Sequence, residues 1–126
     1  AGRPRLLAEA LQTLVVEEDV GLAWVTVPPG AVERHRVTVD DLDGIVEFPR
    51  SIAGVRMAML FREISQSRVK VSLRSVGEVD VAAFAKPYGG GGHVHAAGVA
   101  LDGGLPEVQA KILAAAREYL RGLPRV

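Results

Sequence analysis

The sequence predicts a single α/β domain, in which a mixed β-sheet with a central hairpin is flanked by helices. The length of 126 residues suits one domain that buries roughly two-thirds of the surface of its unfolded chain. Apolar residues recur at helical spacing near both ends of the chain, and strand-like apolar runs occupy its middle. No internal repeat interrupts this order.

The chain is predicted to begin with a helix over residues 5–15, followed by a strand. The apolar residues of the helix share one face: Leu6, Leu7, Ala10, Leu11, Leu14 and Val15. A compact run rich in β-branched residues at 22–27 predicts a buried strand, which Pro28 ends.

Two helices are expected between this strand and the hairpin. A short helix begins at about Pro29, and a second runs from about Asp40 to Phe48. Asp40 or Asp41 would be its N-cap, because a carboxylate can accept hydrogen bonds from the free N–H groups of the first turn. Pro49 would end the helix because it has no N–H to donate.

A β-hairpin is predicted at the centre of the chain. The long apolar run at residues 54–64 forms its first arm, and residues 68–75 form its second. Gln66 and Ser67 supply the turn between them.

The C-terminal third is predicted to contain two helices and a short strand. Asp80 can cap a helix over residues 81–85 that stops near Pro87, and a strand follows at 98–101. After a glycine turn, the last helix runs from about 105 to 122. Its apolar stripe consists of Val108, Ile112, Leu113, Ala116 and Leu120.

The composition limits the classes of function. Fifteen basic residues balance fifteen acidic ones, which argues against strong non-specific binding to nucleic acid but leaves room for one local anion site. The chain has no cysteine, so disulfides and thiolate metal sites are excluded. No apolar run is long enough to span a bilayer, so we expect no membrane association and a cytoplasmic location. Because the chain starts without Met, we expect a fragment of a larger protein.

A glycine run followed by histidine is the feature most suggestive of a binding site. It consists of Gly89, Gly90, Gly91, Gly92 and His93. Glycine lets a ligand approach the backbone closely, and successive exposed N–H groups suit an anion. The alternative is a flexible linker, but the patterned apolar segments on both sides of the run favour a binding site.

The second arm of the hairpin carries polar side chains on one face. Strict alternation directs Lys70, Ser72 and Arg74 to the side opposite Val69, Val71 and Leu73. An ammonium, a hydroxyl and a guanidinium on one face suit phosphate. The alternative is a solvated strand face, and the position of the strand shortly before the glycine run favours the phosphate site.

The remaining polar clusters predict no catalytic or metal site. His93 and His95 have no neighbouring carboxylate or thiolate to complete a set of metal ligands. His35 lies between two arginines and is expected to be exposed. The acidic residues around Asp41 are explained by helix capping.

The glycine-histidine run and its surroundings resemble a known family, the DHH-associated domain of DHH phosphoesterases. The hallmark of that domain is Gly-Gly-Gly-His-x-x-Ala-Ala-Gly, which residues 90–98 match. The chain is most similar to the C-terminal half of bifunctional oligoribonuclease/phosphoadenosine-phosphate phosphatases (nano-RNases). Further matching segments are 46–52 (Val-Glu-Phe-Pro-Arg-Ser-Ile), 60–63 (Leu-Phe-Arg-Glu), 69–75 (Val-Lys-Val-Ser-Leu-Arg-Ser) and 80–83 (Asp-Val-Ala-Ala).

The resemblance implies a division of labour between two domains. Residues 1–126 would be the substrate-binding domain, which binds short RNA or nucleotide phosphates and closes over a catalytic DHH domain of the same polypeptide. Manganese would be held by that catalytic domain, because this chain contains no Asp-His-His triplet, and this chain alone would be inactive. The substrate-binding positions implied are Arg74, Gly89, Gly90, Gly91, Gly92 and His93, with Ser72, Lys70 and Arg62 as weaker matches.

Two other classes of function stay open at this stage. One is a nucleic-acid-binding module, as in RecJ-like exonucleases or the related end domain of alanyl-tRNA synthetases. The other is a structural domain that mediates dimerisation, since the full-length protein could be a homodimer.

Overall fold

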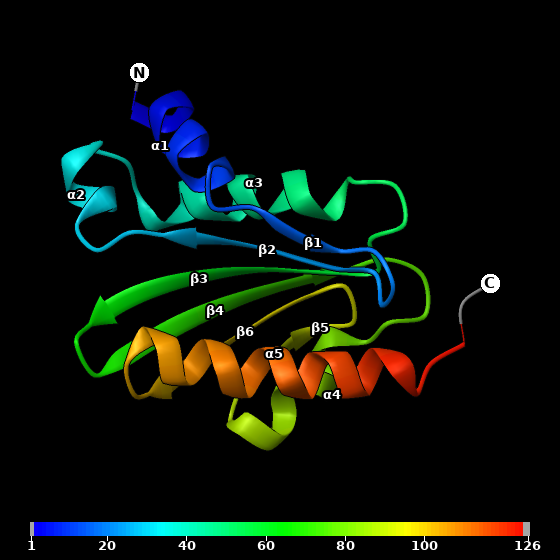
Figure 1. Cartoon of the computed structure of the whole chain (residues 1–126). Helices are drawn as coiled ribbons and strands as arrows, with labels where there is room; N and C mark the ends of the chain where they lie inside the picture. The colour runs from blue at the N-terminus through cyan, green and yellow to red at the C-terminus, as the bar shows by residue number, and fades with distance from the viewer. Residues whose placement is uncertain (1, 125–126) are drawn as a thin grey trace.

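A six-stranded mixed sheet organises the molecule and confirms the predicted fold class (Figure 1). The computed structural model describes residues 2–124. The strand order is β1-β2-β3-β4-β6-β5, and only the β2–β3 pair is parallel. The strands are β1 (Val15–Glu17), β2 (Leu22–Val27), β3 (Met57–Ser65), β4 (Arg68–Ser75), β5 (Gly91–His93) and β6 (Ala96–Asp102).

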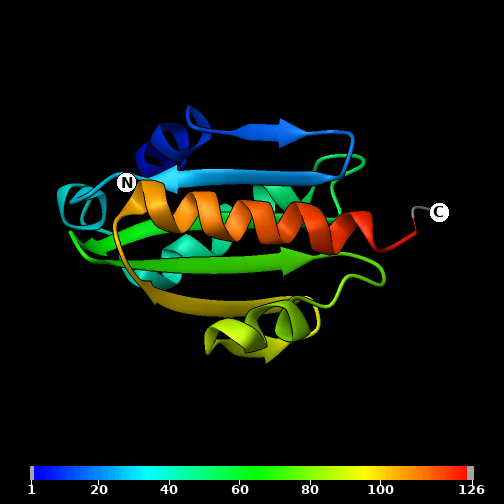
Figure 2. The same cartoon turned by 60° about the horizontal axis from the view of Figure 1, so that its bottom comes forward.

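The helices form a layer on each face of the sheet. One face, called here the α3 face, carries α1 (Gly2–Leu11), α2 (Ala31–Arg34) and α3 (Val39–Arg50). The other, the α5 face, carries α4 (Val81–Ala85), the 3₁₀ turn η1 (Lys86–Tyr88) and α5 (Leu105–Arg121). Figure 2 shows α5 lying over the sheet, roughly along the direction of the strands, with α4 beside β6 and β5.

Each face has its own apolar core, and the alternation along the strands separates the two. Val69, Val71 and Leu73 of β4 are fully buried in the core under α5. The core under α3 contains Val25 and Leu60 from the neighbouring strands. The polar side chains of β4 therefore point to the α3 face, as the period of two predicts.

The predicted hairpin, the last helix and the Asp80 cap are confirmed. β3 and β4 pair as an antiparallel hairpin, and Gln66 and Ser67 lie in its turn. All five residues predicted for the apolar stripe of α5 are buried. The Asp80 carboxylate accepts a hydrogen bond from the Ala83 N–H at 3.0 Å, which fixes the first turn of α4.

The first helix is shorter than predicted. It ends at Leu11, and the Thr13 hydroxyl donates to Ala10 O at 2.6 Å. The same oxygen accepts from the Thr26 N–H at 2.7 Å, which turns the chain toward the sheet. Val15 is therefore in a short edge strand that was not predicted, because a three-residue strand gives no periodicity signal.

Both predicted ends of α3 are wrong by a few residues. Thr38 is the N-cap, and Asp41 completes a capping box by accepting from the Thr38 N–H at 2.9 Å. Pro49 lies inside the last turn, and the Ser51 N–H still donates to Glu47 O at 3.0 Å. Pro49 has no N–H to donate to the preceding turn, and the bond from Ser51 carries the helix past it.

His35 is half-buried and paired, which corrects the expectation of an exposed side chain. Its Nε2 lies 2.6 Å from Glu9 Oε2, and Arg34 Nη2 lies 2.6 Å from Glu9 Oε1. The hydrogen bond with His35, and after it the one from Arg34, lower the pKa of Glu9 below its ordinary value. The N-terminal end of α1 lies beside the segment that follows α2, which brings these groups together across 26 residues of sequence. No local pattern reveals this contact.

No helix among residues 2–124 combines the length and the apolarity needed to cross a membrane.

A bidentate ion pair ties the edge strand β1 to α5. Arg117 Nε and Nη2 each lie 2.8 Å from a carboxylate oxygen of Glu17. The hydrogen bonds from Arg117 lower the pKa of Glu17, and the same pair raises the pKa of Arg117. The Arg117 guanidinium also lies 5.9 Å from the centre of the Trp24 ring.

Glu17→Gln should destabilise the fold at neutral pH and not at low pH. We expect a loss of about 1 kcal/mol in the free energy of unfolding at pH 7, the upper range for a well-aligned surface pair. The lowered pKa of Glu17 means that its contribution is fully present above the unfolded pKa near 4.5. It is lost as the pH falls through the folded pKa.

Urea unfolding followed by Trp24 fluorescence at pH 7 and pH 3 measures this difference. Glu78→Gln, at an exposed position between β4 and α4, is the control. A Glu17→Gln deficit that is equal at both pH values would contradict the role of the ion pair.

Candidate functional site

The α3 face of the sheet is left partly uncovered. α3 packs on β2, β3 and β4, while β6 and β5 extend beyond it (Figure 1). The residues of these last strands that point to this face are half-buried or exposed. This surface, called the open face below, consists of Lys70, Ser72, Arg74, Gly91, His93, Ala96, Gly98 and Ala100.

The strand register places Arg74 and His93 in one row of the open face. Arg74 lies opposite Ala96, and Ala96 lies opposite His93. Residues directly opposite each other in an antiparallel pair project to the same side of the sheet. Only the methyl group of Ala96 therefore stands between the Arg74 and His93 side chains, and His93 is exposed.

The glycine run forms an edge strand and its entry, because Gly91, Gly92 and His93 pair with β6. Three of its four glycines are required by the backbone. Gly89 has φ +83°, and Gly92 has φ +146°. A Cβ on Gly90 would lie 2.4 Å from Gly98 O, so no larger residue fits without moving β6.

Gly91 is the glycine that the fold does not require. An added Cβ would have no atom within 4 Å, and its φ is not positive. In the sheet register Gly91 lies opposite Gly98, which lies opposite Ser72. The three residues of this row contribute little side-chain volume of their own, which leaves room for the Lys70 side chain over Gly98 and keeps the backbone of Gly91 accessible to a ligand.

Lys70 and Arg62 lie toward the other end of the sheet. A Cβ on Gly98 would lie 2.9 Å from Lys70 Nζ, so the lysine side chain extends over Gly98 toward the middle of the open face. Arg62 lies opposite Lys70 and borders a cavity of about 230 Å³ beside α2. Arg62 therefore lies beside Lys70 on the side away from the glycine run, whereas the Lys70 side chain extends toward that run.

A buried serine, which sequence analysis missed, holds the tight turn that follows His93. The Ser75 N–H donates to His95 O at 3.1 Å, and its hydroxyl lies 3.1 Å from Val94 O and 2.6 Å from Val79 O. The His95 ring contributes through Nε2, which lies 2.7 Å from Gly77 O. This turn fixes the end of β5 and therefore the place of His93.

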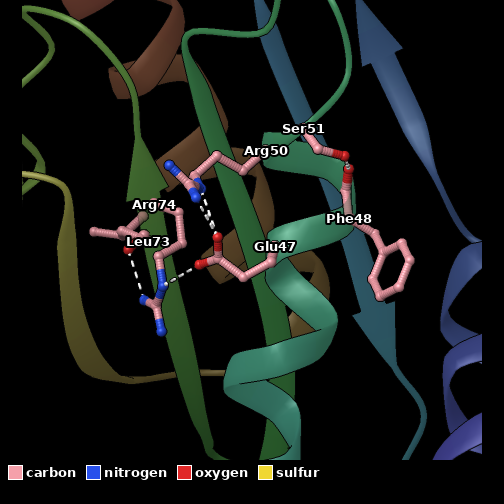
Figure 3. Close-up of polar contacts among 6 residues, drawn as sticks. All are labelled: Glu47, Phe48, Arg50, Ser51, Leu73 and Arg74. Atoms are coloured by element: carbon pink, nitrogen blue, oxygen red, sulfur yellow. Dashed lines mark hydrogen bonds and ion pairs between the residues drawn. The ribbon is translucent and has the colours of Figure 1, made fainter.

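Arg74 is already bound by protein acceptors. Its Nη1 donates to Leu73 O at 2.9 Å, and Nε lies 3.2 Å from Glu47 Oε2 (Figure 3). Nη2 lies 3.2 Å from Asp43 Oδ1. The side chain is only 13% exposed. Arg74 is therefore held against α3 instead of standing free on the strand face, as its alternation alone had suggested.

The residues that hold Arg74 were not identified from the sequence. Asp43 and Glu47 lie four residues apart on α3, and Arg50 follows three residues later, so all share one helix face. Arg50 Nε lies 2.7 Å from Glu47 Oε1. That spacing could have indicated a charged cluster, whereas we had attributed the acidic residues to capping.

Among residues 2–124, no group of three or more His, Cys, Asp or Glu side chains could hold a metal ion. A cavity of about 570 Å³ lies on the α5 face, bordered by Phe84, Tyr88 and Tyr119. It lies on the opposite side of the sheet from Arg74 and His93.

Comparison with known proteins shows relatives over nearly the whole chain. The family model described as the DHHA1 domain matches residues 20–122. The bifunctional oligoribonuclease and PAP phosphatase NrnA of Thermus thermophilus is 33% identical over 117 residues, which are 92% of this chain and 34% of that protein.

Solved structures show the same fold. An exopolyphosphatase-related protein from Bacteroides fragilis superposes with a TM-score of 0.84 at 29% identity, over 95% of this chain and 35% of that one. Exonuclease RecJ bound to manganese superposes with a TM-score of 0.63 at 20% identity, over 98% of this chain and 29% of that one. The chain thus spans about a third of the length of these relatives.

Substitutions in the glycine run should distinguish the glycines that the fold requires from Gly91, which it does not require. Gly91→Ala should change the free energy of unfolding by less than about 0.5 kcal/mol, since the new methyl group meets nothing. Gly90→Ala should cost more than about 2 kcal/mol, because the methyl group would overlap the backbone of β6. Urea unfolding curves of the two variants make the comparison, and equal losses would show that Gly91 is also required by the fold.

Proposed function

The chain belongs to the DHHA1 domain family, and we propose that it binds the phosphate groups of nucleotides or short RNA as the substrate-binding domain of a DHH-family phosphoesterase. The family gives a function related to nucleic acids or nucleotides. The relative from Thermus thermophilus is a bifunctional oligoribonuclease and PAP phosphatase, which favours short RNA and nucleotide phosphates over other substrates.

The observation that carries this proposal is the gap over Gly91 beside His93. The fold leaves a side chain out of a position where one would fit, and polar side chains surround that position on the same face. Lys70 and Arg74 bring positive charge, Ser72 a hydroxyl, and His93 an exposed ring nitrogen. These groups and the accessible backbone suit a phosphate oxygen.

Catalysis would need a second domain. The chain spans 34% of the length of its Thermus thermophilus relative, so we place the catalytic DHH domain on the same polypeptide, with residues 1–126 as the substrate-binding domain. No cluster of ligands in residues 2–124 fits a metal ion, and one RecJ structure is described as manganese-bound. Manganese would therefore be held by that other domain, and this chain's residues would position the phosphate.

A nucleic-acid-binding module is the second candidate. The similarity to RecJ extends over 98% of this chain but at 20% identity supports the fold alone. A module would bind longer strands more tightly, since each added phosphate contributes to the affinity. A pocket for short substrates would reach its full affinity within a few nucleotides. Dimerisation as the main role stays a third prediction, favoured if the chain dimerises and binds no anion.

His93→Ala and Arg74→Ala should each weaken the binding of an RNA dinucleotide with a terminal phosphate. Losing a charge-assisted hydrogen bond costs on the order of 1.5–3 kcal/mol, or roughly a tenfold to 150-fold rise in Kd. NMR titration measures this, and circular dichroism verifies that each variant is folded. Arg68→Ala is the charge-matched control, because Arg68 lies on the same strand but pairs with Asp102.

The same titration with strands of two to twelve nucleotides separates the candidates. An affinity that stops rising within the first few nucleotides supports the proposal, and one that keeps rising favours the module. Affinities unchanged by His93→Ala and Arg74→Ala would contradict the assignment of the open face.

The isolated chain should not hydrolyse phosphoesters. Because residues 2–124 offer no cluster of metal ligands, added manganese should not produce turnover of short RNA or adenosine 3′,5′-bisphosphate. Product release followed by chromatography tests this. Turnover that co-purifies with the chain and persists in independent preparations would contradict the division of labour between two domains.

A further inference from the structure

The two carboxylates that hold Arg74 differ in how they are themselves held, and we propose that they have opposite effects on anion binding. Glu47 positions the Arg74 guanidinium. Asp43 places its negative charge beside Nη2, the end of the guanidinium that a substrate phosphate would approach, and so competes with that phosphate. The inference rests on the proposed function, because it assigns roles around the same phosphate site.

The Arg74 guanidinium has an acceptor at each of its three nitrogens. Nη1 is bound by Leu73 O within the same strand, and Nε by Glu47. Nη2 contacts the Asp43 carboxylate at 3.2 Å. A guanidinium has five N–H groups, so one on Nη1 and at least one on Nη2 stay available. A phosphate that approaches Nη2 meets the Asp43 carboxylate at the same nitrogen.

Glu47 is fixed from two sides. Oε2 faces Arg74, and Oε1 lies 2.7 Å from Arg50 Nε. Figure 3 shows both guanidinium groups directed at this one carboxylate. Because two arginines hold the Glu47 carboxylate, it fixes the Arg74 side chain before a ligand arrives. Arg74 therefore loses little conformational entropy when the ligand binds.

Asp43 is held far less firmly. Its side chain is 62% exposed, against 42% for Glu47. Within residues 2–124, the Arg74 contact is the one ion pair or hydrogen bond that its side chain makes. Water screens such a contact, and a doubly charged phosphate is a stronger acceptor than a carboxylate. Asp43 is therefore the acceptor that a phosphate would displace.

This difference predicts effects of opposite sign. Neutralising any nearby carboxylate raises the local positive potential, so electrostatics alone would make both variants bind an anion more tightly. If Glu47 positions Arg74, Glu47→Gln should instead weaken binding. Asp43→Asn should strengthen it, because the negative charge beside Nη2 is removed.

NMR titration of this chain with adenosine 3′,5′-bisphosphate tests the pair. We expect Kd to fall threefold to tenfold in Asp43→Asn and to rise at least threefold in Glu47→Gln. Asp40→Asn is the matched control: it removes the same charge from the same helix at an exposed position without an Arg74 contact, and should change Kd by less than twofold.

The Arg74 Nε–H signal provides a readout that a purely electrostatic effect would not move. It should be sharp and protected from exchange in the wild type and in Asp43→Asn, and broadened in Glu47→Gln. Tighter binding by both variants, or an Asp43→Asn effect equal to that of Asp40→Asn, would overturn the inference while leaving the phosphate site in place. Failure of the wild type to bind the probe would instead overturn the proposed function, and the competitive role of Asp43 with it.

Discussion

The alternation along β4 is the constraint on which the rest of the structure depends. Every second residue is fully buried under α5, so the register of this strand cannot slip by one without exposing the core. The same alternation forces Lys70, Ser72 and Arg74 to the α3 face. The stability of the α5 core therefore fixes the orientation of the polar groups that line the candidate site.

Close packing at the sheet edge supplies the second constraint. Gly90 packs against the backbone of β6, and Gly92 has a positive φ and also lies close to β6. Ser75, at the end of β4, holds the turn that follows His93. The edge strand is thereby tied to the central strand, which lets a three-residue strand hold His93 in a defined row. Of the four glycines in the run, Gly91 alone needs neither a positive φ nor close packing. The space above it is therefore the place where we expect a ligand.

Much of the fold could be predicted from the sequence, because its main elements leave local signals. The first arm of the hairpin is a continuous apolar run and the second arm alternates. α5 shows a stripe of five buried residues between glycine caps. Asp80 accepts a hydrogen bond from the first turn of α4, as expected of an N-cap. Each of these features depends on residues within a few positions of one another.

The missed features depend on contacts between distant segments. β1 and β5 have three residues each and exist only because longer strands lie beside them. His35 is paired because α1 lies beside the segment that follows α2. The α3 carboxylates reach Arg74 across 27 and 31 residues of sequence. The alternation of β4 could therefore indicate the face to which Arg74 points, but not that Glu47 and Asp43 bind its guanidinium there.

A structure of this chain with a bound RNA dinucleotide is the most direct test of the phosphate site on the open face. We expect the phosphate over Gly91, within hydrogen-bond distance of the His93 ring and of the Arg74 guanidinium. Binding on the opposite side of the sheet, in the cavity bordered by Phe84, Tyr88 and Tyr119, would contradict it.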